Sequence, residues 1–303
     1  MRVTPLGAAA RNFLIVCTMA RLTWIALVFL LVRASTMVVP QNIVVIGGGI
    51  QGTSVAYHLA ERGASVTILE AKEPASAASG KGGGFMARSW GDGGPTQGLH
   101  HLGFDLYETL AVELGCTSYR KLPVLSVSPG YDGIKLAQKK KDLAELLPNW
   151  LDGKVGRISA MGYGDDTAQI TPKEFVDQML ERQADRIQVV LGTCTKVETD
   201  QGSERGSRKV TAVEYEPRDG SGETQVLPAD VVVVSAGPWS CAAEDWFPGS
   251  VKLPMEGVKS TSIVWKKPEG SEVDATALFC GEDNRFGTHC EYLLSLPTES
   301  GLF

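Results

Sequence analysis

The 303-residue sequence lacks the cysteine and histidine patterns that would indicate a metal site or a disulfide framework. Its six cysteines stand far apart without a CxxC pair, and its four histidines show no ligand spacing. Zinc sites and small disulfide scaffolds both need closely spaced groups of such residues. We therefore expect reduced, structural thiols and no bound metal.

Basic clusters are also scarce. The net charge is −6, and the only dense basic run, Lys139–Lys141, lies in a polar stretch that predicts a solvated helix face. Binding to nucleic-acid phosphates requires a clustered basic surface. We expect no nucleic-acid partner.

Residues 1–36 contain no acidic side chain, which separates them from the rest of the chain. Three arginines precede the apolar run TWIALVFLLV, and the small residues Ala34–Thr36 follow it. This order is the layout of a secretory signal or signal anchor. A membrane span needs about 20 apolar residues, and Arg21 shortens this run. A cleaved leader is therefore the better secretory interpretation, with membrane attachment through residues 12–32 as the alternative.

Two further absences argue against a location outside the cytosol. The sequence has no Asn-x-Ser/Thr sequon, and because Cys17 alone lies in the leader, five of the six cysteines remain after it. An odd number leaves one cysteine without a disulfide partner. Met37 stands just before the first predicted strand and is a second candidate start. The sequence thus predicts a cytoplasmic protein if translation starts at Met37, and otherwise an endomembrane or secretory one.

A strand, a glycine-rich turn and a helix follow the leader. Residues 43–46 are β-branched, as expected of a strand buried on both faces of a parallel sheet. The run Gly47-Gly48-Gly49-Ile50-Gln51-Gly52 then fits the dinucleotide-binding pattern G-x-G-x-x-G. In this pattern Gly47 permits the tight turn, Gly49 lets the backbone approach a pyrophosphate, and Gly52 lets the helix lie close to the strand.

The unit closes with a second strand and an acidic residue. An apolar stripe at helical spacing follows the turn, and Gly63 is expected to end that helix. Residues 66–69 predict a strand that finishes in Glu70-Ala71, about 20 residues beyond the turn. A carboxylate there accepts hydrogen bonds from both ribose hydroxyls and repels a 2′-phosphate. The expected cofactor is FAD or NAD rather than NADP.

A second glycine cluster distinguishes these two cofactors. It comprises Ser79, Gly80, Lys81, Gly82, Gly83 and Gly84. A run with so few side chains suits a loop pressed against a flat ring system or a second phosphate, with a flexible linker as the alternative. An NAD-dependent dehydrogenase gives no reason for this cluster, so FAD is the predicted cofactor.

With these motifs the sequence resembles the D-amino-acid oxidase/glycine oxidase-like (DAO-type) FAD-dependent oxidoreductases, and its SGKGGGF form is similar to a eukaryotic branch of that group. The resemblance implies that Lys81 and Gly82–Gly84 lie beside the flavin. The segment AQITPKEFVDQML, residues 168–180, resembles a helix of the same family. Its residues also predict a capping box, with Thr171 as the N-cap and Glu174 as its partner.

Two later segments continue the resemblance. In IQVVLGTCTKVETD, residues 187–200, the family likeness implies that Val197 contacts the adenine end through its backbone. The segment ADVVVVSAGPWS, residues 229–240, predicts a buried strand and a turn near the cofactor, and the implied site residues there are Ala236, Gly237 and Trp239. An ordinary Pro/Gly turn is the alternative for this last segment taken alone.

The expected fold class is α/β, with a Rossmann-like FAD-binding domain in which crossover helices flank a parallel sheet. We assign residues 37–115 and 165–250 to that domain, and residues 116–164 and 251–303 to a mixed α+β substrate domain that is incomplete at the C-terminus. Within the first, a leucine stripe from Leu99 to Leu114 predicts an amphipathic helix closed by Gly115. Residues 253–266 predict the return into the substrate sheet.

The resemblance implies an FAD-dependent oxidoreductase that oxidises a C–N bond of a small amine or amino-acid-like substrate by hydride transfer to flavin. It covers residues 42–292, whereas family chains continue further, so a truncated product is expected. No catalytic acid or base can be named, and His289, Tyr292 and Lys259 are expected to be structural or surface groups. The alternative is a catalytically incomplete FAD-binding protein, either an assembly or interaction factor or a truncated gene product.

Overall fold

The computed structural model describes residues 42–130, 141–151, 155–201, 208–249, 251–261, 263, 269–270, 272–280, 293–294, 297–298 and 301–302. The chain divides into residues 1–40 and 41–303, and everything below concerns the second part. The predicted leader, Lys139, His289 and Tyr292 lie outside the described residues. Within the described ranges we find no helix with a long enough apolar stretch to cross a membrane.

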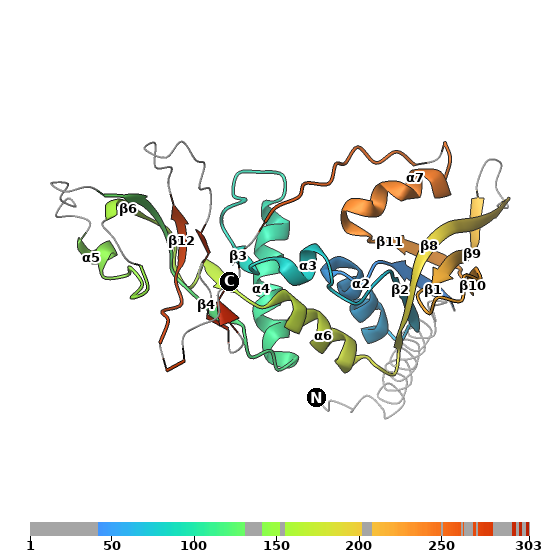
Figure 1. The fold of residues 1–303 in the computed structure, drawn as a ribbon, viewed down its shortest axis with the longest axis horizontal. Coiled ribbons are helices and arrows are strands. Elements are labelled where there is room, and N and C mark those ends of the chain that lie inside the picture. The colour runs from blue at the N-terminus through green and yellow to red at the C-terminus, as the bar shows by residue number, and fades with distance from the viewer. Residues whose placement is uncertain are drawn as a thin grey trace, which may run out of the picture. The chain divides into compact units, whose positions relative to one another are not determined.

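A six-stranded sheet with parallel strands at its centre forms the first half of the fold (Figure 1). Its strand order is β10-β9-β8-β2-β1-β11, and β1 pairs in parallel with β2 and β11. The strands are β1 (Ile43–Ile46), β2 (Val66–Glu70), β8 (Ile187–Gln201), β9 (Arg208–Pro217), β10 (Gln225–Pro228) and β11 (Val231–Val234). The predicted α/β class with a parallel sheet is confirmed.

Helices cover both faces of this sheet because side chains of β1 alternate between them. Val45 packs with Ala56 and Ala60 of α2 (Ile50–Glu61), and Leu180 of α6 (Pro172–Arg182) joins the same cluster. On the opposite face, Val44 and Ile46 pack in a cluster with Trp246 of α7 (Ala243–Trp246). All four residues of β1 are buried, as the β-branched run predicts.

Both predicted glycine C-caps are present. Gly63 has φ +91°, its N–H donates to the Ala60 carbonyl, and the N–H of Ala64 donates to the Leu59 carbonyl. Gly115 ends α4 (Gln97–Glu113) in the same way, with φ +71°. This is the hydrogen-bond pattern of a Schellman motif, in which glycine avoids the steric cost of positive φ.

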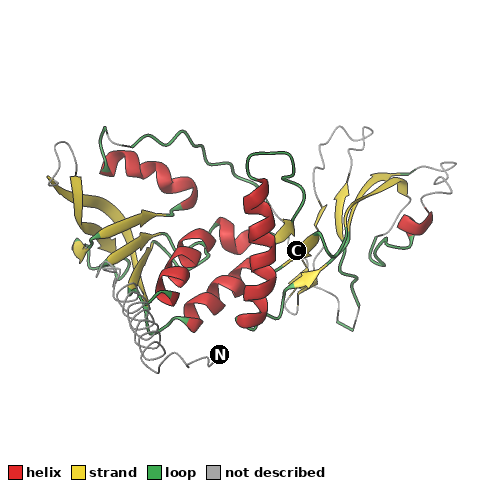
Figure 2. Cartoon of the chain, turned by 180° about the vertical axis from the view of Figure 1, so that it is seen from behind, coloured by secondary structure: helices red, strands yellow, loops and turns green. Residues whose placement is uncertain are grey.

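The leucine stripe of α4 does not face the core along its whole length, so that prediction is wrong for its first half. Leu99 and Leu102 are 71% and 63% exposed, whereas Leu110 and Leu114 are buried. The second half of α4 packs in one cluster with Phe175 of α6 and with Tyr57 of α2. Figure 2 shows these helices side by side. Helical spacing shows which residues a helix can bury together, but the neighbouring elements decide which of them are buried.

Two smaller sheets form the other half of the fold. A four-stranded sheet has the order β13-β12-β5-β6, and a three-stranded sheet has the order β3-β7-β4. Their strands are β3 (Phe85–Ala87), β4 (Arg120–Lys121), β5 (Val124–Pro129), β6 (Val155–Gly162), β7 (Thr167–Gln169), β12 (Ala277–Cys280) and β13 (Leu293–Leu294). A further pair joins β14 (Pro297–Thr298) to β15 (Gly301–Leu302), and a short helix α5 (Lys141–Ala144) precedes β6.

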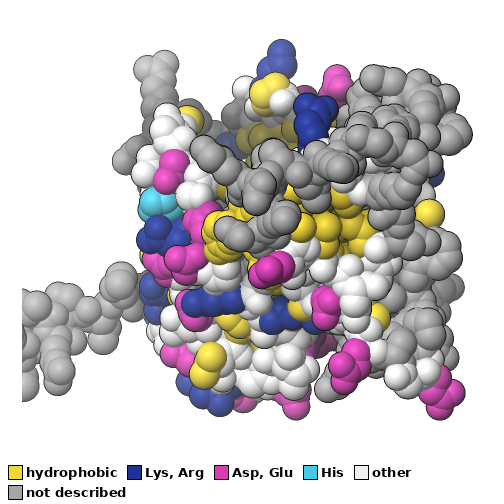
Figure 3. All heavy atoms as spheres, turned by 90° about the vertical axis from the view of Figure 1, so that its left-hand side faces the viewer, with side chains coloured by type: hydrophobic (Ala, Val, Ile, Leu, Met, Phe, Trp, Pro, Cys, Tyr) yellow, Lys and Arg dark blue, Asp and Glu magenta, His cyan; other side chains and the backbone are white. Residues whose placement is uncertain are grey.

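The return of the chain into the four-stranded sheet occurs later than predicted. Residues 251–261 form no strand, and β12 pairs in parallel with β5 instead. The expectation of a sheet strand from residue 253 is therefore wrong for its described part, which belongs to none of the sheets. The face shown in Figure 3 mixes basic with acidic side chains, in keeping with the scattered charges of the sequence.

Glu174 stabilises the start of α6, although not as the predicted capping box. Thr171 is the N-cap, but it makes no side-chain cap bond. The Glu174 carboxylate instead accepts hydrogen bonds from the N–H and hydroxyl groups of Thr117 and Ser118, at 2.7 Å from the Thr117 N–H. Partial burial raises the pKa of Glu174, but these hydrogen bonds outweigh that effect and hold the pKa below its usual value.

We predict that Glu174→Gln lowers the free energy of unfolding by about 1–2 kcal/mol at neutral pH, since hydrogen bonds to a charged acceptor are lost. A carboxyl group whose pKa is lowered on folding contributes stability above its unfolded pKa of about 4.3, and loses it as the pH falls through the folded pKa. Urea denaturation should therefore show that the difference in free energy of unfolding between wild type and variant disappears below about pH 4. The exposed Asp177→Asn, which breaks only an i,i+4 pair with Lys173, should cost about 0.5 kcal/mol or less. If Glu174→Gln lowered the free energy of unfolding at neutral pH by no more than Asp177→Asn does, the result would contradict this account.

Candidate functional site

The turn between β1 and α2 requires glycine at two of its predicted positions. Gly47 has φ +105°, and a Cβ added there would lie 2.4 Å from the carbonyl oxygen of Ser235. A Cβ at Gly52 would lie 2.0 Å from the carbonyl oxygen of Gly47. The tight turn and the close approach of helix to strand, which the motif predicts for these positions, are both present.

The N-terminus of α2 is arranged like an anion-binding site. Its N-cap, Gly49, is extended and offers no side-chain cap, and its first turn holds no acidic residue. The N–H of Ile50 donates to the Ser79 hydroxyl at 3.0 Å. The N–H groups of Gln51 and Gly52 have no hydrogen-bond partner within the described residues. The free N–H groups and the helix dipole together favour a negatively charged ligand here.

Glu70 lies at the carboxyl end of β2, beside the same turn. One carboxylate oxygen accepts a hydrogen bond from the N–H of Gly48 at 2.7 Å, and the other accepts one from the N–H of Lys72 at 2.9 Å. A carboxylate has about four acceptor positions, so Glu70 retains the capacity to accept two hydroxyl hydrogen bonds. Ala71 follows it at the surface. The free N–H groups of α2 and a carboxylate with spare acceptor positions thus lie at the same turn.

The second glycine cluster is joined directly to the first. Ala75 has φ +56°, and its N–H donates to the Gly48 carbonyl at 3.0 Å. Ser79 and Gly80 belong to a short helix, α3 (Ala78–Lys81), where the sequence predicts a loop. A Cβ at Gly80 would lie 1.8 Å from the Ala75 carbonyl oxygen, and one at Gly84 would lie 1.7 Å from that of Ile170. The chain's own backbone therefore requires glycine at 80 and 84.

The rest of the second cluster leads into β3. Lys81 is exposed, and Gly82 is the C-cap of α3 with an extended backbone. The carbonyl of Gly83 accepts a hydrogen bond from the Gln169 side chain at 3.1 Å. The Gln169 side chain of β7 thus helps to position the backbone of this segment.

The two C-terminal site segments lie at different distances from the turn. Ala236, which follows β11, directly contacts the first glycine, since its Cα lies 3.0 Å from a Cβ added at Gly47. Gly237 has φ +57° and begins the 3-10 helix η2 (Gly237–Ala242), in which Trp239 is 64% exposed. Val197 is buried in the antiparallel part of β8, in one cluster with Leu69. Contacts between described residues therefore bring Gly47–Gly52, Glu70, Ser79 and Ala236 together. Val197 lies in the core cluster of the sheet, and Trp239 is exposed.

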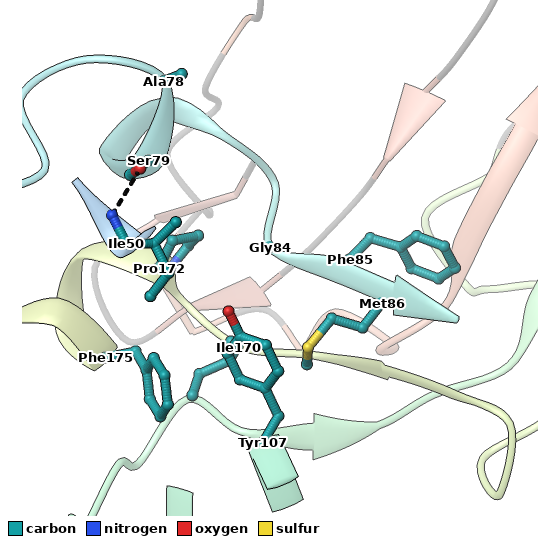
Figure 4. A pocket seen from close by; sticks show the side chains of 10 residues that line it. All are labelled: Ile50, Ala78, Ser79, Gly84, Phe85, Met86, Tyr107, Ile170, Pro172 and Phe175. Atoms are coloured by element: carbon teal, nitrogen blue, oxygen red, sulfur yellow. Dashed lines mark hydrogen bonds between the residues drawn. The ribbon is translucent and has the colours of Figure 1, made fainter. Parts of the chain in front are cut away.

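A cavity of about 170 Å³ adjoins the start of α2 (Figure 4). It is lined by Ile50, Ala78, Ser79, Gly84, Phe85, Met86, Tyr107, Ile170, Pro172 and Phe175. Sequence reasoning missed Tyr107 and Phe175 as members of a site. The sequence offers only a weak indication of Tyr107 as a site residue. It lies three residues before Leu110 on α4, a spacing that equally predicts an ordinary core residue.

The titratable groups of the described residues do not single out a catalytic acid or base. Burial raises the pKa of the Cys116 and Cys194 thiols to about 11, so both are protonated near neutral pH and are poor nucleophiles. Lys259 is exposed, as expected of a surface group. In the part of the chain that the structure describes, no three His, Cys, Asp or Glu side chains are grouped so as to hold a metal ion.

Comparison with known proteins identifies similar sequences and folds. The family model described as FAD dependent oxidoreductase (DAO) matches residues 42–293. A curated protein of Schizosaccharomyces pombe, provisionally named an oxidoreductase, is 26% identical over 215 residues, which are 66% of this chain and 55% of the relative. The chain therefore spans about half the length of that relative.

Two solved structures share the fold. L-proline dehydrogenase from P. horikoshii has a TM-score of 0.58 and 15% identity, and the match covers 86% of this chain and 68% of that one. Glycine oxidase from Bacillus cereus has a TM-score of 0.50 and 21% identity, with 68% of this chain and 58% of that one covered.

We predict that Gly52→Ala destabilises the protein by several kcal/mol, because the new methyl group overlaps the Gly47 carbonyl oxygen. Gly98→Ala is a matched control: Gly98 lies in helix α4, and nothing stands within 4 Å of an added Cβ. That substitution should stabilise the helix by about 0.5–1 kcal/mol. Thermal unfolding of the two variants should move in opposite directions, and a Gly52→Ala protein as stable as wild type would contradict the close approach.

Proposed function

Because the chain belongs to the family of FAD dependent oxidoreductases, we propose that the Gly47–Gly52 turn, Glu70 and the second glycine cluster hold FAD, the cofactor of that family. The observation that carries this proposal is the adjacency of two complementary groups. Glu70 hydrogen-bonds the Gly48 N–H at the same turn that presents the free N–H groups of Gln51 and Gly52. A ribose diol followed by a pyrophosphate fits these groups in that order.

The remaining predicted residues extend this site in two directions. Val197, Ala236, Gly237 and Trp239 are proposed to border the nucleotide half, since Ala236 contacts Gly47. Ser79, Gly80, Lys81 and Gly82–Gly84 are proposed to border the flavin half. Ser79 occupies the position between the two halves, because its hydroxyl accepts from the Ile50 N–H.

We propose that the whole protein oxidises a C–N bond of a small amine or amino-acid-like substrate. Two structures with the same fold carry names that refer to glycine and to L-proline, which supports this substrate class. FAD, when bound, supplies the hydride acceptor. The chain's own contribution is to orient substrate and cofactor and to exclude water. Membrane attachment through residues 12–32 and the absence of a nucleic-acid partner stay predictions.

A second candidate is an FAD-binding protein without its own activity, which acts with a partner. The observation in its favour is the exposed apolar stretch after α7, where Val258 is 93% exposed and Ile263 is 65% exposed. Apolar side chains exposed along one segment often mark an interaction surface. This candidate binds FAD at the same proposed site as the first but does not itself oxidise a substrate.

We predict that Glu70→Gln lowers the affinity for FAD about 10-fold and leaves the affinity for FMN unchanged. FMN lacks the adenosine ribose, and the glutamine oxygen can still accept from the Gly48 N–H, so only the ribose contact loses its charged acceptor. Both affinities can be measured by titration, with flavin fluorescence as the signal. The exposed Glu73→Gln is the matched control and should change neither. Equal losses of affinity for FAD and FMN, or no loss for either, would contradict the proposed contact between Glu70 and the ribose.

Anaerobic reduction of bound flavin distinguishes the two candidate functions. If the chain is an oxidoreductase for C–N bonds, at least one member of a panel of D-amino acids, N-methyl amino acids and glycine should bleach the flavin absorbance. Dithionite is the control that shows the flavin can be reduced. Retention of oxidised flavin with every substrate, while dithionite reduces it, would support the second candidate.

A further inference from the structure

The cavity beside α2 is lined almost entirely by hydrocarbon. Ile50, Met86, Ile170, Pro172 and Phe175 form most of its wall, and none of the described residues that line it is charged (Figure 4). Transfer of a charged group into such surroundings is strongly unfavourable without a partner of opposite charge. Its chemistry therefore suits an uncharged ligand.

Its volume restricts the ligand to about one ring. An engineered apolar cavity of about 150 Å³ stays dry and binds benzene, whereas pockets for drug-sized ligands measure about 300–1,000 Å³. At about 170 Å³ the present cavity is close to the first case in volume, but it is partly open to solvent. It is too small to contain FAD, whose pyrophosphate we assign to the neighbouring N–H groups of α2.

Tyr107 supplies one polar group to this apolar space. Its ring packs on Phe175, with ring centroids 4.8 Å apart and an interplanar angle of 37°. Its hydroxyl points into the cavity in Figure 4 and has no hydrogen-bond partner within the described residues. Burial raises the pKa of Tyr107, so the hydroxyl is a neutral donor near neutral pH. The other hydroxyl in the wall, that of Ser79, already accepts from Ile50.

A tyrosine hydroxyl that faces an apolar cavity usually donates a hydrogen bond, to protein, ligand or water. We propose that the cavity binds a small, uncharged aromatic molecule of about benzene size, which accepts a hydrogen bond from the Tyr107 hydroxyl. Such a ligand accepts the hydrogen bond of the Tyr107 hydroxyl and covers the apolar wall at the same time. This site is separate from the proposed FAD site, although Ile50, Ser79 and Gly84 border both.

Phenol, benzene and benzoate are the probes that test this proposal. We expect phenol to bind one per chain, benzene to bind more weakly, and benzoate not to bind, because it carries a charge into an apolar cavity. NMR of methyl-labelled methionine locates the ligand: the Met86 signal should shift with phenol, whereas the signal of Met255, which is 42% exposed outside the cavity, should not. No Met86 shift in the folded wild-type protein at saturating phenol would overturn the proposal.

Tyr107→Phe tests the hydrogen bond without changing the cavity's shape. The affinity for phenol should fall about 2- to 10-fold, to that of benzene, while the affinity for benzene stays the same. Tyr119→Phe is the matched control, since the Tyr119 hydroxyl has no hydrogen-bond partner within the described residues and does not line the cavity. It should leave phenol binding unchanged. An undiminished phenol affinity in Tyr107→Phe would show that Tyr107 does not recognise the ligand.

Repeating the phenol titration with FAD distinguishes this inference from the proposed function. Simultaneous binding of FAD and phenol supports both. Displacement of phenol by FAD would mean that a ring of the cofactor fills the cavity, and would overturn the separate site. Binding of phenol to a protein that ignores FAD would support the cavity site and refute the proposed cofactor site.

Discussion

The hydrogen bond from the Gly48 N–H to the Glu70 carboxylate is the contact on which the rest of the site depends. At 2.7 Å it fixes the end of β2 against the turn that follows β1. The same turn contacts the end of β11, where a side chain at Gly47 would overlap Ser235. Three parallel strands are therefore held together at their carboxyl ends, which is where open α/β sheets bind their ligands.

The second glycine cluster depends on this turn as well. Ala75 donates to the Gly48 carbonyl, and Ser79 accepts from the Ile50 N–H, so the segment after Glu70 folds back over the start of α2. Gly80 then packs against Ala75, and Gly84 against Ile170. The two clusters, which lie about 30 residues apart in the sequence, are thus in direct contact.

Local features of this arrangement could be predicted from the sequence because each depends on a few neighbouring residues. The β-branched run of β1, the glycine turn and the glycine C-caps at Gly63 and Gly115 are of this kind. Features that depend on distant partners could not be predicted. Leu99 and Leu102 follow the same spacing as Leu110, yet only Leu110 has core neighbours. Glu174 stands where a capping box is expected, yet its carboxylate accepts hydrogen bonds from Thr117 and Ser118 instead.

The central claim is that the turn, Glu70 and the second cluster hold FAD. The most direct test is to denature the purified, folded protein and identify the released nucleotide by mass spectrometry. This account predicts FAD, at about one per chain after reconstitution. Release of NAD, or a folded protein that takes up no FAD when it is added in excess, would contradict it.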